Sequence, residues 1–352
     1  MPALEQAVHR ASRRRVLSGL AGAAGVAGMW RPAGTVRAQE GPDDEGPNVG
    51  EGAGEPPPMA RPLIVQIDND PRARPSSNLG AASYVYEYTA EGGVTRFSAI
   101  FTDQDDVGPI GNIRSARLAT IEIVRQFNGI LFYHGGATGI QQHIWESWID
   151  FVSFELAENF PYFTRVPWRP RPYNSYSDLP RMRAAAAQHE IALTLPTRAY
   201  FPHGDYDPPD QTPPANRIIL PYQNGFQVRY EYDPSTNAYW RFMAGRPHWD
   251  DGLGAQITTQ NVIVQFVPSF LTDIVEDIYG SRSLDYALQG SGPAWVFRNG
   301  LWIDALWHRP EAWSFTAYYD AKGQNIPLAP GTAWISLVAP DAPVQAWYEE
   351  DG

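Results

Sequence analysis

Two patterns of hydrophobic and polar residues divide the chain after residue 60. From residue 61 to 201, short apolar runs alternate with segments whose apolar residues recur every three or four positions. The short runs predict strands at 63–67, 83–89, 94–101 and 129–133. The longer period predicts helices at 115–127, 140–151 and 180–190. We therefore expect a mixed α/β domain over residues 61–201.

After residue 216 the pattern is almost entirely that of β-strands. Alternating segments on either side of turn sequences predict hairpins at 226–243 and around Asn299-Gly300, a dipeptide that favours a type I′ turn. A core strand is expected at 261–267. The segment 270–279 is expected to form a short helix. The predicted fold class is α+β, with a mostly antiparallel β domain over residues 217–345 following the α/β domain.

The two predicted domains are separated by a proline-rich segment at residues 202–216. It contains five prolines and three aspartates. Proline has no backbone N–H and is tolerated poorly in helices and central strands. This segment is therefore expected to be a connector.

Residues 1–38 resemble an export signal. Three arginines at 13–15 precede a weakly hydrophobic run at 16–29, which is too short to span a bilayer. Val36-Arg37-Ala38 places small residues where a signal peptidase cleaves. Together they predict a twin-arginine signal and an extracytoplasmic or secreted protein without a transmembrane span, the alternative being a soluble helix that starts with arginines. Residues 39–60 contain six acids and no bases and are expected to be a disordered leader.

Composition excludes several classes of function. The 352 residues include 27 Lys and Arg, 39 Asp and Glu and no Cys, for a net charge of -12. The lack of Cys excludes thiolate catalysis, Cys-based metal sites and lipid attachment through a cysteine. The acidic balance argues against nucleic acid as a partner. The chain has no GxxxxGK[ST], GxGxxG, HExxH or GxSxG sequence, so no cofactor and no metal are predicted.

The candidate binding residues of the first part are polar side chains near predicted strand ends and helix starts. They are Asp68, Arg96, Arg114, Arg117, His134 and Asn174. Arg114 and Arg117 lie three positions apart at a predicted helix start, where two guanidinium groups oppose the helix dipole. A bound phosphate or carboxylate would relieve this repulsion. Internal salt bridges to the acids at 103–106 would do the same, and both interpretations stay open.

A second candidate group lies in the predicted β domain. Arg246, His248 and Asp250 fall within the turn sequence GRPHWD at 245–250. Charge, imidazole and indole are concentrated there in a few residues. A structured loop with a hydrogen-bonded histidine is the alternative to a binding site.

Longer stretches of the sequence resemble a known family. RPLIVQIDNDPRARP (61–75), VGPIGNIRSARL (107–118) and LFYHGGA (131–137) are similar to the N-terminal half of the YerB-like lipoprotein family, and GRPHWDD (245–251) and IPLAPGTAWISLVAP (326–340) to its C-terminal half. The resemblance spans residues 61 to 340 and implies an exported, envelope-associated protein of two domains. It implies no catalytic mechanism. This chain departs from the family by lacking the lipobox Cys and by an extra Gly-Asn before Arg114.

Three functions are compatible with these observations. The first is a non-catalytic binding or scaffold module that engages an envelope glycan or protein through aromatic and arginine-lined grooves. The second is an enzyme acting on a phosphate-bearing envelope substrate, with Arg96, Arg114 and Arg117 holding the phosphate and His134 or Asp68 as base. The third is a structural secreted protein.

Overall fold

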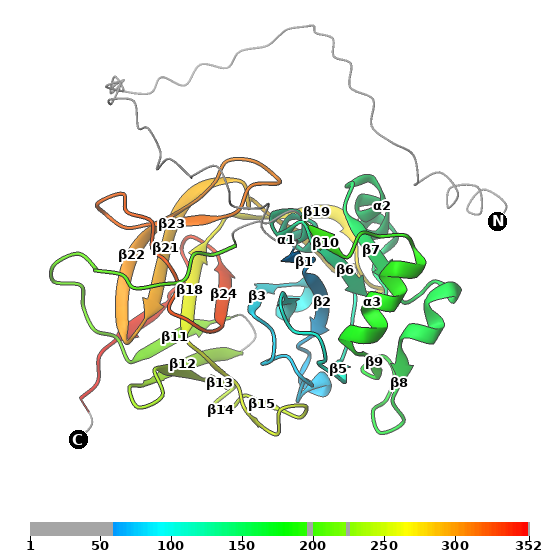
Figure 1. The fold of residues 1–352 in the computed structure, drawn as a ribbon, viewed down its shortest axis with the longest axis horizontal. Coiled ribbons are helices and arrows are strands. Elements are labelled where there is room, and N and C mark those ends of the chain that lie inside the picture. The colour runs from blue at the N-terminus through cyan, green and yellow to red at the C-terminus, as the bar shows by residue number, and fades with distance from the viewer. Residues whose placement is uncertain (1–58, 196–199, 223–225, 351–352) are drawn as a thin grey trace, which may run out of the picture. The chain divides into compact units, whose positions relative to one another are not determined.

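A computed structural model describes residues 59–195, 200–222 and 226–350 (Figure 1). The expected export signal, and the expected leader up to residue 58, lie outside the described residues. The last two leader residues form strand β1 (Met59–Ala60), which pairs with β10 (Thr194–Leu195). Within the described part of the chain, no helix is long and apolar enough to cross a membrane.

The fold is organised around a ten-stranded mixed sheet (Figure 1), in the order β23-β22-β21-β18-β24-β3-β4-β2-β6-β7. Its strands are β2 (Leu63–Asp68), β3 (Tyr84–Thr89), β4 (Thr95–Phe101), β6 (Ile130–Tyr133), β7 (Asp150–Ser153), β18 (Asn261–Phe266), β21 (Gly290–Arg298), β22 (Leu301–Arg309), β23 (Ala317–Tyr319) and β24 (Ala333–Val338). Strand β24 lies parallel to both of its neighbours, β18 and β3. The sequence regions before and after the connector 202–216 thus share one sheet.

A second, antiparallel sheet comes from the C-terminal region alone. It contains β11 (Arg217–Pro221), β12 (Gln227–Asp233), β13 (Ala238–Met243), β14 (Arg246–Pro247), β17 (Thr258–Thr259) and β25 (Gln345–Trp347). Besides the pair of β1 and β10, the small sheets are β5 (Ile110–Gly111) with β9 (Ser175–Ser177) and β8 (Thr164–Arg165), β15 (Trp249–Asp250) with β16 (Ala255–Gln256), and β19 (Ser269–Val275) with β20 (Arg282–Tyr286).

Two hydrophobic cores cover the two faces of the large sheet. Side chains alternate between the faces of a strand, so Leu63 and Val65 of β2 belong to one core and Ile64 to the other. The first core includes residues of α3 (Leu179–Gln188) and of the second sheet. The other includes residues of α1 (Leu118–Phe127) and α2 (Thr138–Glu146).

The predicted α+β class is confirmed. The α-helices of the described residues all precede residue 190, and the strands after residue 216 are mostly antiparallel. The hairpin at Asn299-Gly300 also forms, with positive φ at both residues (52° and 72°). Asp178 caps α3 by accepting a hydrogen bond from the backbone N–H of Arg181.

Two helix predictions are corrected. The segment 270–279 is not a helix, because residues 269–275 form β19 and pair with β20 across a turn. Its apolar residues recur with helical spacing, but the cross-strand pairing decides its conformation. The helix expected at 140–151 ends at Glu146, two residues before Trp148, whose φ of 63° is left-handed. Residues 150–153 become strand β7.

A fully buried ion pair ties three strands of the fold together. The guanidinium of Arg241 on β13 lies 2.5 Å from the carboxylate of Glu87 on β3, and both side chains are 0% exposed. Glu87 also accepts hydrogen bonds from Thr95 (2.8 Å) and from the indole of Trp334 on β24 (3.2 Å). The guanidinium carbon of Arg241 lies 4.2 Å from the Trp334 ring centroid. Both charges are therefore held by pairing, hydrogen bonds and a cation–π contact.

Removing one partner of this pair should destabilise the protein strongly. Arg241→Met leaves the Glu87 carboxylate buried without its partner, which costs about 3–5 kcal/mol. Urea unfolding measures the change. Arg282→Met, which removes a surface pair with Asp273, should cost less than about 1 kcal/mol. The double variant Arg241→Met/Glu87→Gln should recover part of the loss, and equal losses in Arg241→Met and Arg282→Met would contradict the assignment.

Candidate functional site

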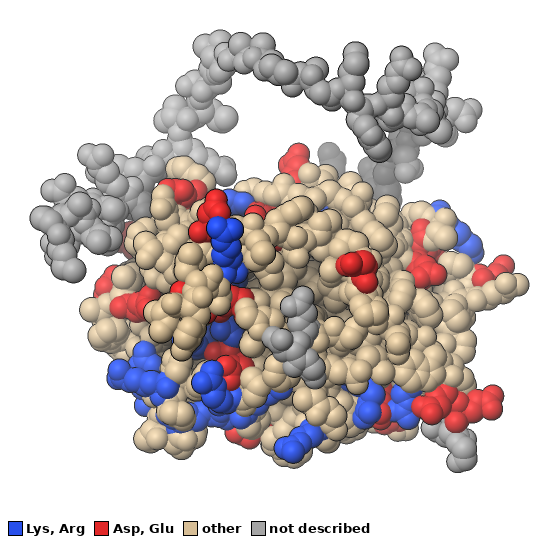
Figure 2. Space-filling model, turned by 180° about the vertical axis from the view of Figure 1, so that it is seen from behind, with Lys and Arg blue, Asp and Glu red and all other residues tan. Residues whose placement is uncertain are grey.

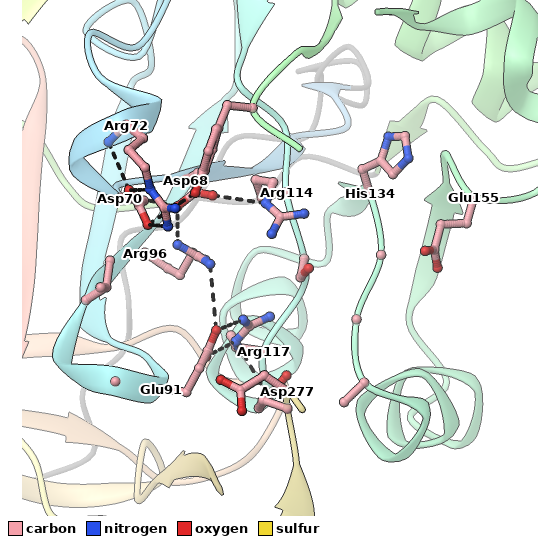
Figure 3. Close-up of a pocket in the computed structure, with 18 of the residues that line it drawn as sticks. Asp68, Asp70, Arg72, Glu91, Arg96, Arg114, Arg117, His134, Glu155 and Asp277 are labelled. Carbon is pink, nitrogen blue, oxygen red and sulfur yellow. Dashed lines mark hydrogen bonds and ion pairs between the residues drawn. The ribbon is translucent and has the colours of Figure 1, made fainter. Parts of the chain in front are cut away.

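A cavity of about 640 Å³ opens beside the large sheet, at the end of the sheet where strands β2, β6 and β7 finish (Figure 3). Strands β2, β6 and β7 are parallel, so their carboxyl ends lie at the same edge. Asp68 is the last residue of β2, His134 follows β6, and Glu155 lies two residues after β7. All three line the cavity. In open sheets, ligands bind outside the carboxyl ends of parallel strands, which makes this edge the first candidate for a site.

One wall of the cavity is a row of six alternating charges. In order, the row runs Arg114, Asp68, Arg96, Glu91, Arg117, Glu276. Asp68 accepts from Arg96 and also from Nε of Arg114 at 3.0 Å. Glu91 accepts from Nε of Arg117 at 2.6 Å and lies 3.7 Å from Arg96. Figure 3 shows the first five members of this row, from Arg114 to Arg117, on the side opposite His134 and Glu155.

Burial and pairing shift the two carboxyl groups at the Arg117 end in opposite directions. Burial raises the pKa of Glu91, but the charges and hydrogen bonds of Arg117, together with the charge of Arg96, outweigh it and lower that pKa to about 2. Burial also raises the pKa of Glu276, and there the attraction of Arg117, 3.5 Å away, does not compensate for it. Of the two carboxyl groups, Glu91 is therefore the one whose ionised form is stabilised by Arg117.

The arginines predicted from the sequence do converge, but their partners differ from those considered. Arg96, Arg114 and Arg117 pair with Asp68, Glu91 and Glu276. The acids at 103–106 form none of the ion pairs found among the described residues. Arg96 and Arg117 are almost fully buried, whereas the Arg114 side chain is 25% exposed. Arg114 is thus the member of the three that is best placed to meet a ligand.

The imidazole of His134 has a defined tautomer. Its Nε2 lies 2.7 Å from Nη2 of Arg165, and its Nδ1 lies 2.8 Å from Oγ of Ser175. A guanidinium only donates hydrogen bonds, so Nε2 must accept and Nδ1 carries the proton that is donated to Ser175. An imidazole in this state cannot take a proton from Ser175. His134 and Ser175 therefore do not form a nucleophile pair in which the histidine activates the serine.

Three arginines surround this neutral imidazole. Burial, followed by the charges of Arg165, Arg114 and Arg171, lowers the pKa of His134 to about 4. The pKa of Arg165 is also lowered, by its partial burial and then by the charges of Arg171 and Arg114. Neither Arg165 nor Arg171 forms a salt bridge within the described residues. The His134 side of the cavity thus gathers positive charge that the protein neutralises only in part.

A second cavity of about 530 Å³ adjoins the first. It shares three lining residues with it: His134, Glu155 and Arg165. Its other lining residues are Phe154, Phe160, Phe163 and Arg171. The charged cavity therefore continues into a compartment with aromatic walls.

Asn174 supports the site from behind. Its Oδ1 accepts from Nη1 of Arg165 at 3.0 Å, and its amide donates to the backbone of Val166. Asn174 is not among the residues that line either cavity. It holds the Arg165 guanidinium in place next to His134.

The second predicted group lies elsewhere in the fold. Arg246 is exposed on β14, and neither it nor His248 nor Asp250 lines either cavity. The pKa of His248 lies well below its usual value because of burial and, next, the charge of Arg241. Asp250 is fully buried and accepts hydrogen bonds from the backbone N–H groups of Asn78 and Gly80. These contacts match the alternative of a structured loop with a buried histidine.

Several residues of the site were not predicted from the sequence. They are Glu91, Glu155, Arg165, Arg171 and Glu276. One signal was available, because residues 161–183 contain five arginines and one acid in an otherwise acidic chain. Figure 2 shows basic side chains gathered at one corner of the back face, on the side of β8, β9 and α3. Glu276 had no such signal, since it enters the cavity from the β19–β20 hairpin. In the described part of the chain, no group of three His, Asp or Glu residues is arranged to hold a metal ion.

Comparison with known proteins identifies the family. Residues 50–192 match the N-terminal domain, and residues 218–335 the C-terminal domain, of a protein family of unknown function, DUF3048. The chain belongs to this family. It is 30% identical over 282 residues to the Bacillus subtilis (strain 168) protein named "Putative lipoprotein YerB", which covers 79% of this chain and 81% of that protein. The crystal structure of YerB from Bacillus subtilis superimposes with a TM-score of 0.69 at 26% identity, covering 82% of this chain and 94% of that one. The resemblance seen in the sequence is thus confirmed.

The neutral state of His134 predicts a pH dependence of stability. In the unfolded chain this imidazole binds a proton below about pH 6.5, but in the folded protein only below about 4. The unfolded state therefore binds more protons between these values, and the free energy of unfolding should fall as the pH drops from 6.5 to 4. His134→Gln should lose less stability over the same interval, as measured by urea unfolding. His143→Gln, which removes an exposed imidazole on α2, should behave like the wild type. A parallel decline in wild type and His134→Gln would contradict a neutral His134.

Proposed function

We propose that the protein is an exported binding module of the cell envelope that holds an anionic ligand in the charged cavity. The observation that carries the proposal is the position of Arg114, Arg165 and Arg171, which line the two joined cavities together with His134, the acceptor of a 2.7 Å hydrogen bond from Arg165. Bringing three guanidinium groups together is unfavourable unless a negative charge joins them. Glu155 offsets one of the three charges in part, and Asp68 is shared between Arg96 and Arg114, so the three guanidinium groups keep an excess of positive charge. A phosphate or carboxylate group of a ligand would complete the site.

The location in the envelope is supported by two observations. Residues 1–38 resemble a twin-arginine signal, with three arginines before a weakly hydrophobic run. The Bacillus subtilis relative is named as a lipoprotein, although this chain has no Cys for such an anchor. We therefore place the protein outside the cytoplasm, where its ligand would be an acidic glycan or another acidic envelope component.

The arrangement favours binding over acid–base catalysis. Asp68 already accepts from two guanidinium groups and from the backbone N–H of Asp70. The free lone pair of His134 accepts from Arg165. Both bases considered for an enzyme are thus occupied in this geometry. The cavity offers donors to an anion, and neither Asp68 nor His134 is free to act as a base there.

Binding of a simple anion tests the proposal. Inorganic phosphate at low ionic strength should raise the melting temperature of the wild type and give a measurable dissociation constant by calorimetry. Arg165→Gln removes a charged donor and should weaken phosphate binding about tenfold to hundredfold.

The matched control is Arg181→Gln on α3. Arg181 is half exposed, lies outside both cavities and pairs with Asp178 at 3.3 Å. Arg181→Gln removes one positive charge, as Arg165→Gln does, but from a position outside both cavities. The phosphate affinity of this variant should therefore equal that of the wild type. Equal weakening in both variants would show a general charge effect, and no phosphate binding by the wild type would overturn the proposed function.

A further inference from the structure

We propose that the ligand is an acidic sugar, with its anionic group among the arginines and its ring in the adjoining aromatic compartment. This inference rests on the proposed function and specifies its ligand class. It is carried by the junction of the two cavities, which share His134, Glu155 and Arg165. A ligand that occupies both cavities must join an anion to a part with an apolar face.

The aromatic compartment includes one exposed ring. Phe160 is 56% exposed, although it is a large apolar side chain. It meets Phe163 edge to face, with 5.8 Å between the ring centroids and an interplanar angle of 79°. Phe154 stacks on Phe163 from within the core, at 5.1 Å and 22°. Phe163 is thus held between Phe154 and Phe160, and the exposed ring of Phe160 is accessible to a ligand.

The charged and aromatic groups are in direct contact where the two cavities meet. The guanidinium carbon of Arg165 lies 5.8 Å from the Phe163 ring centroid. The imidazole of His134 packs edge-on to the same ring at 5.0 Å. Phe163 in turn contacts the exposed ring of Phe160, so the anion-binding groups and the exposed ring are neighbours through one shared aromatic side chain. A carboxylate or phosphate attached directly to a hexose ring would place both parts of a ligand in these adjoining positions.

The polar residues around the aromatic rings favour a sugar over a hydrocarbon chain. Glu155 and Arg171 line the same compartment as the three phenylalanines, and both are exposed. Glu155 accepts one hydrogen bond through Oε2, from Gln141 at 3.0 Å, and its Oε1 makes none within the described residues. A sugar presents an apolar ring face together with hydroxyl groups that donate to such a carboxylate. A hydrocarbon chain would leave these polar groups without partners.

Glu155 has a role in binding an acidic sugar, as an acceptor for its hydroxyl groups. A carboxylate beside an anion site repels the anion, so its position is unfavourable for a ligand that is only an anion. A ligand with hydroxyl groups next to its negative charge removes this conflict, because Glu155 accepts from the hydroxyls while Arg165 and Arg171 hold the charge. Glu155 therefore distinguishes an acidic sugar from a free anion.

Calorimetry with matched probes tests the ligand class. The probes are glucose 1-phosphate, glucuronate, glucose, hexyl phosphate and inorganic phosphate. The wild type should bind glucose 1-phosphate or glucuronate about tenfold more tightly than inorganic phosphate, and glucose more weakly than either. The stronger of the two acidic sugars identifies the anionic group.

Two variants separate the ring from the charge. Phe160→Ala removes the exposed ring and should weaken binding of the acidic sugar about threefold to tenfold, leaving inorganic phosphate binding unchanged. Glu155→Gln should weaken the acidic sugar but not inorganic phosphate. The control is Trp168→Ala, because Trp168 is 71% exposed and lies outside both cavities. It should bind every probe as the wild type does.

The outcomes distinguish this inference from the proposed function. If inorganic phosphate binds in an Arg165-dependent way but neither acidic sugar binds more tightly, the sugar inference is overturned and the anion site stands. Tighter binding of hexyl phosphate than of both acidic sugars would also overturn it, as would unchanged sugar binding by Phe160→Ala. If no anionic probe binds at all, both proposals fail.

Discussion

The buried pair between Glu87 and Arg241 is the constraint on which the remaining geometry depends. Two unpartnered charges would be too costly at this depth, so β3 of the large sheet and β13 of the second sheet must pack with these two side chains in contact. The register of β4 with β3 and with β2 in turn positions the cavity. Glu87 is paired across the sheet with Phe97, whereas Arg96 is paired with Tyr88 on one side and Asp68 on the other. Because neighbouring residues of a strand point to opposite faces, the two charged systems occupy opposite faces of the same strands. A shift of one residue would exchange them.

The charged side chains of the cavity form two groups, the row of ion pairs and the cluster around His134, which have different physical roles. The row from Arg114 to Glu276 neutralises itself, and its buried members give the wall a fixed shape. The cluster around His134 remains short of negative charge. A site built in this way offers preorganised donors without needing to rearrange on binding. The overall acidity of the chain, with a net charge of -12, keeps such a cluster local and favours small ligands over polyanions.

The sequence predicted those parts of the fold that local patterns determine. The α+β class, the Asp178 cap and the Asn299-Gly300 hairpin follow from periodicity and turn chemistry. The residues singled out from the sequence in the first half of the chain are Asp68, Arg96, Arg114, Arg117 and His134, which line one cavity, and Asn174, which lines neither cavity. Pairings over long distances in sequence could not be predicted this way. Glu276 reaches the site through a hairpin whose residues 270–279 have helical spacing, and the insertion of β24 beside β3 leaves no local signal. Arg246, His248 and Asp250 have polar side chains that suggested a site, but the burial of His248 and Asp250 and the backbone contacts of Asp250 depend on the tertiary fold.

The position of β24 has a consequence for how the chain folds. This strand joins β18 to β3, which are about 180 residues apart in the sequence, yet it is one of the last elements to be synthesised. Until residues 333–338 emerge from the ribosome, β3 and β18 each present an open edge that is prone to pairing with other chains. The central sheet must therefore close after synthesis is nearly complete. Its contacts are of high contact order, which slows folding. A chain lacking its last fourteen residues would keep β24, whereas one lacking its last twenty would lose the whole strand and expose both edges to aggregation.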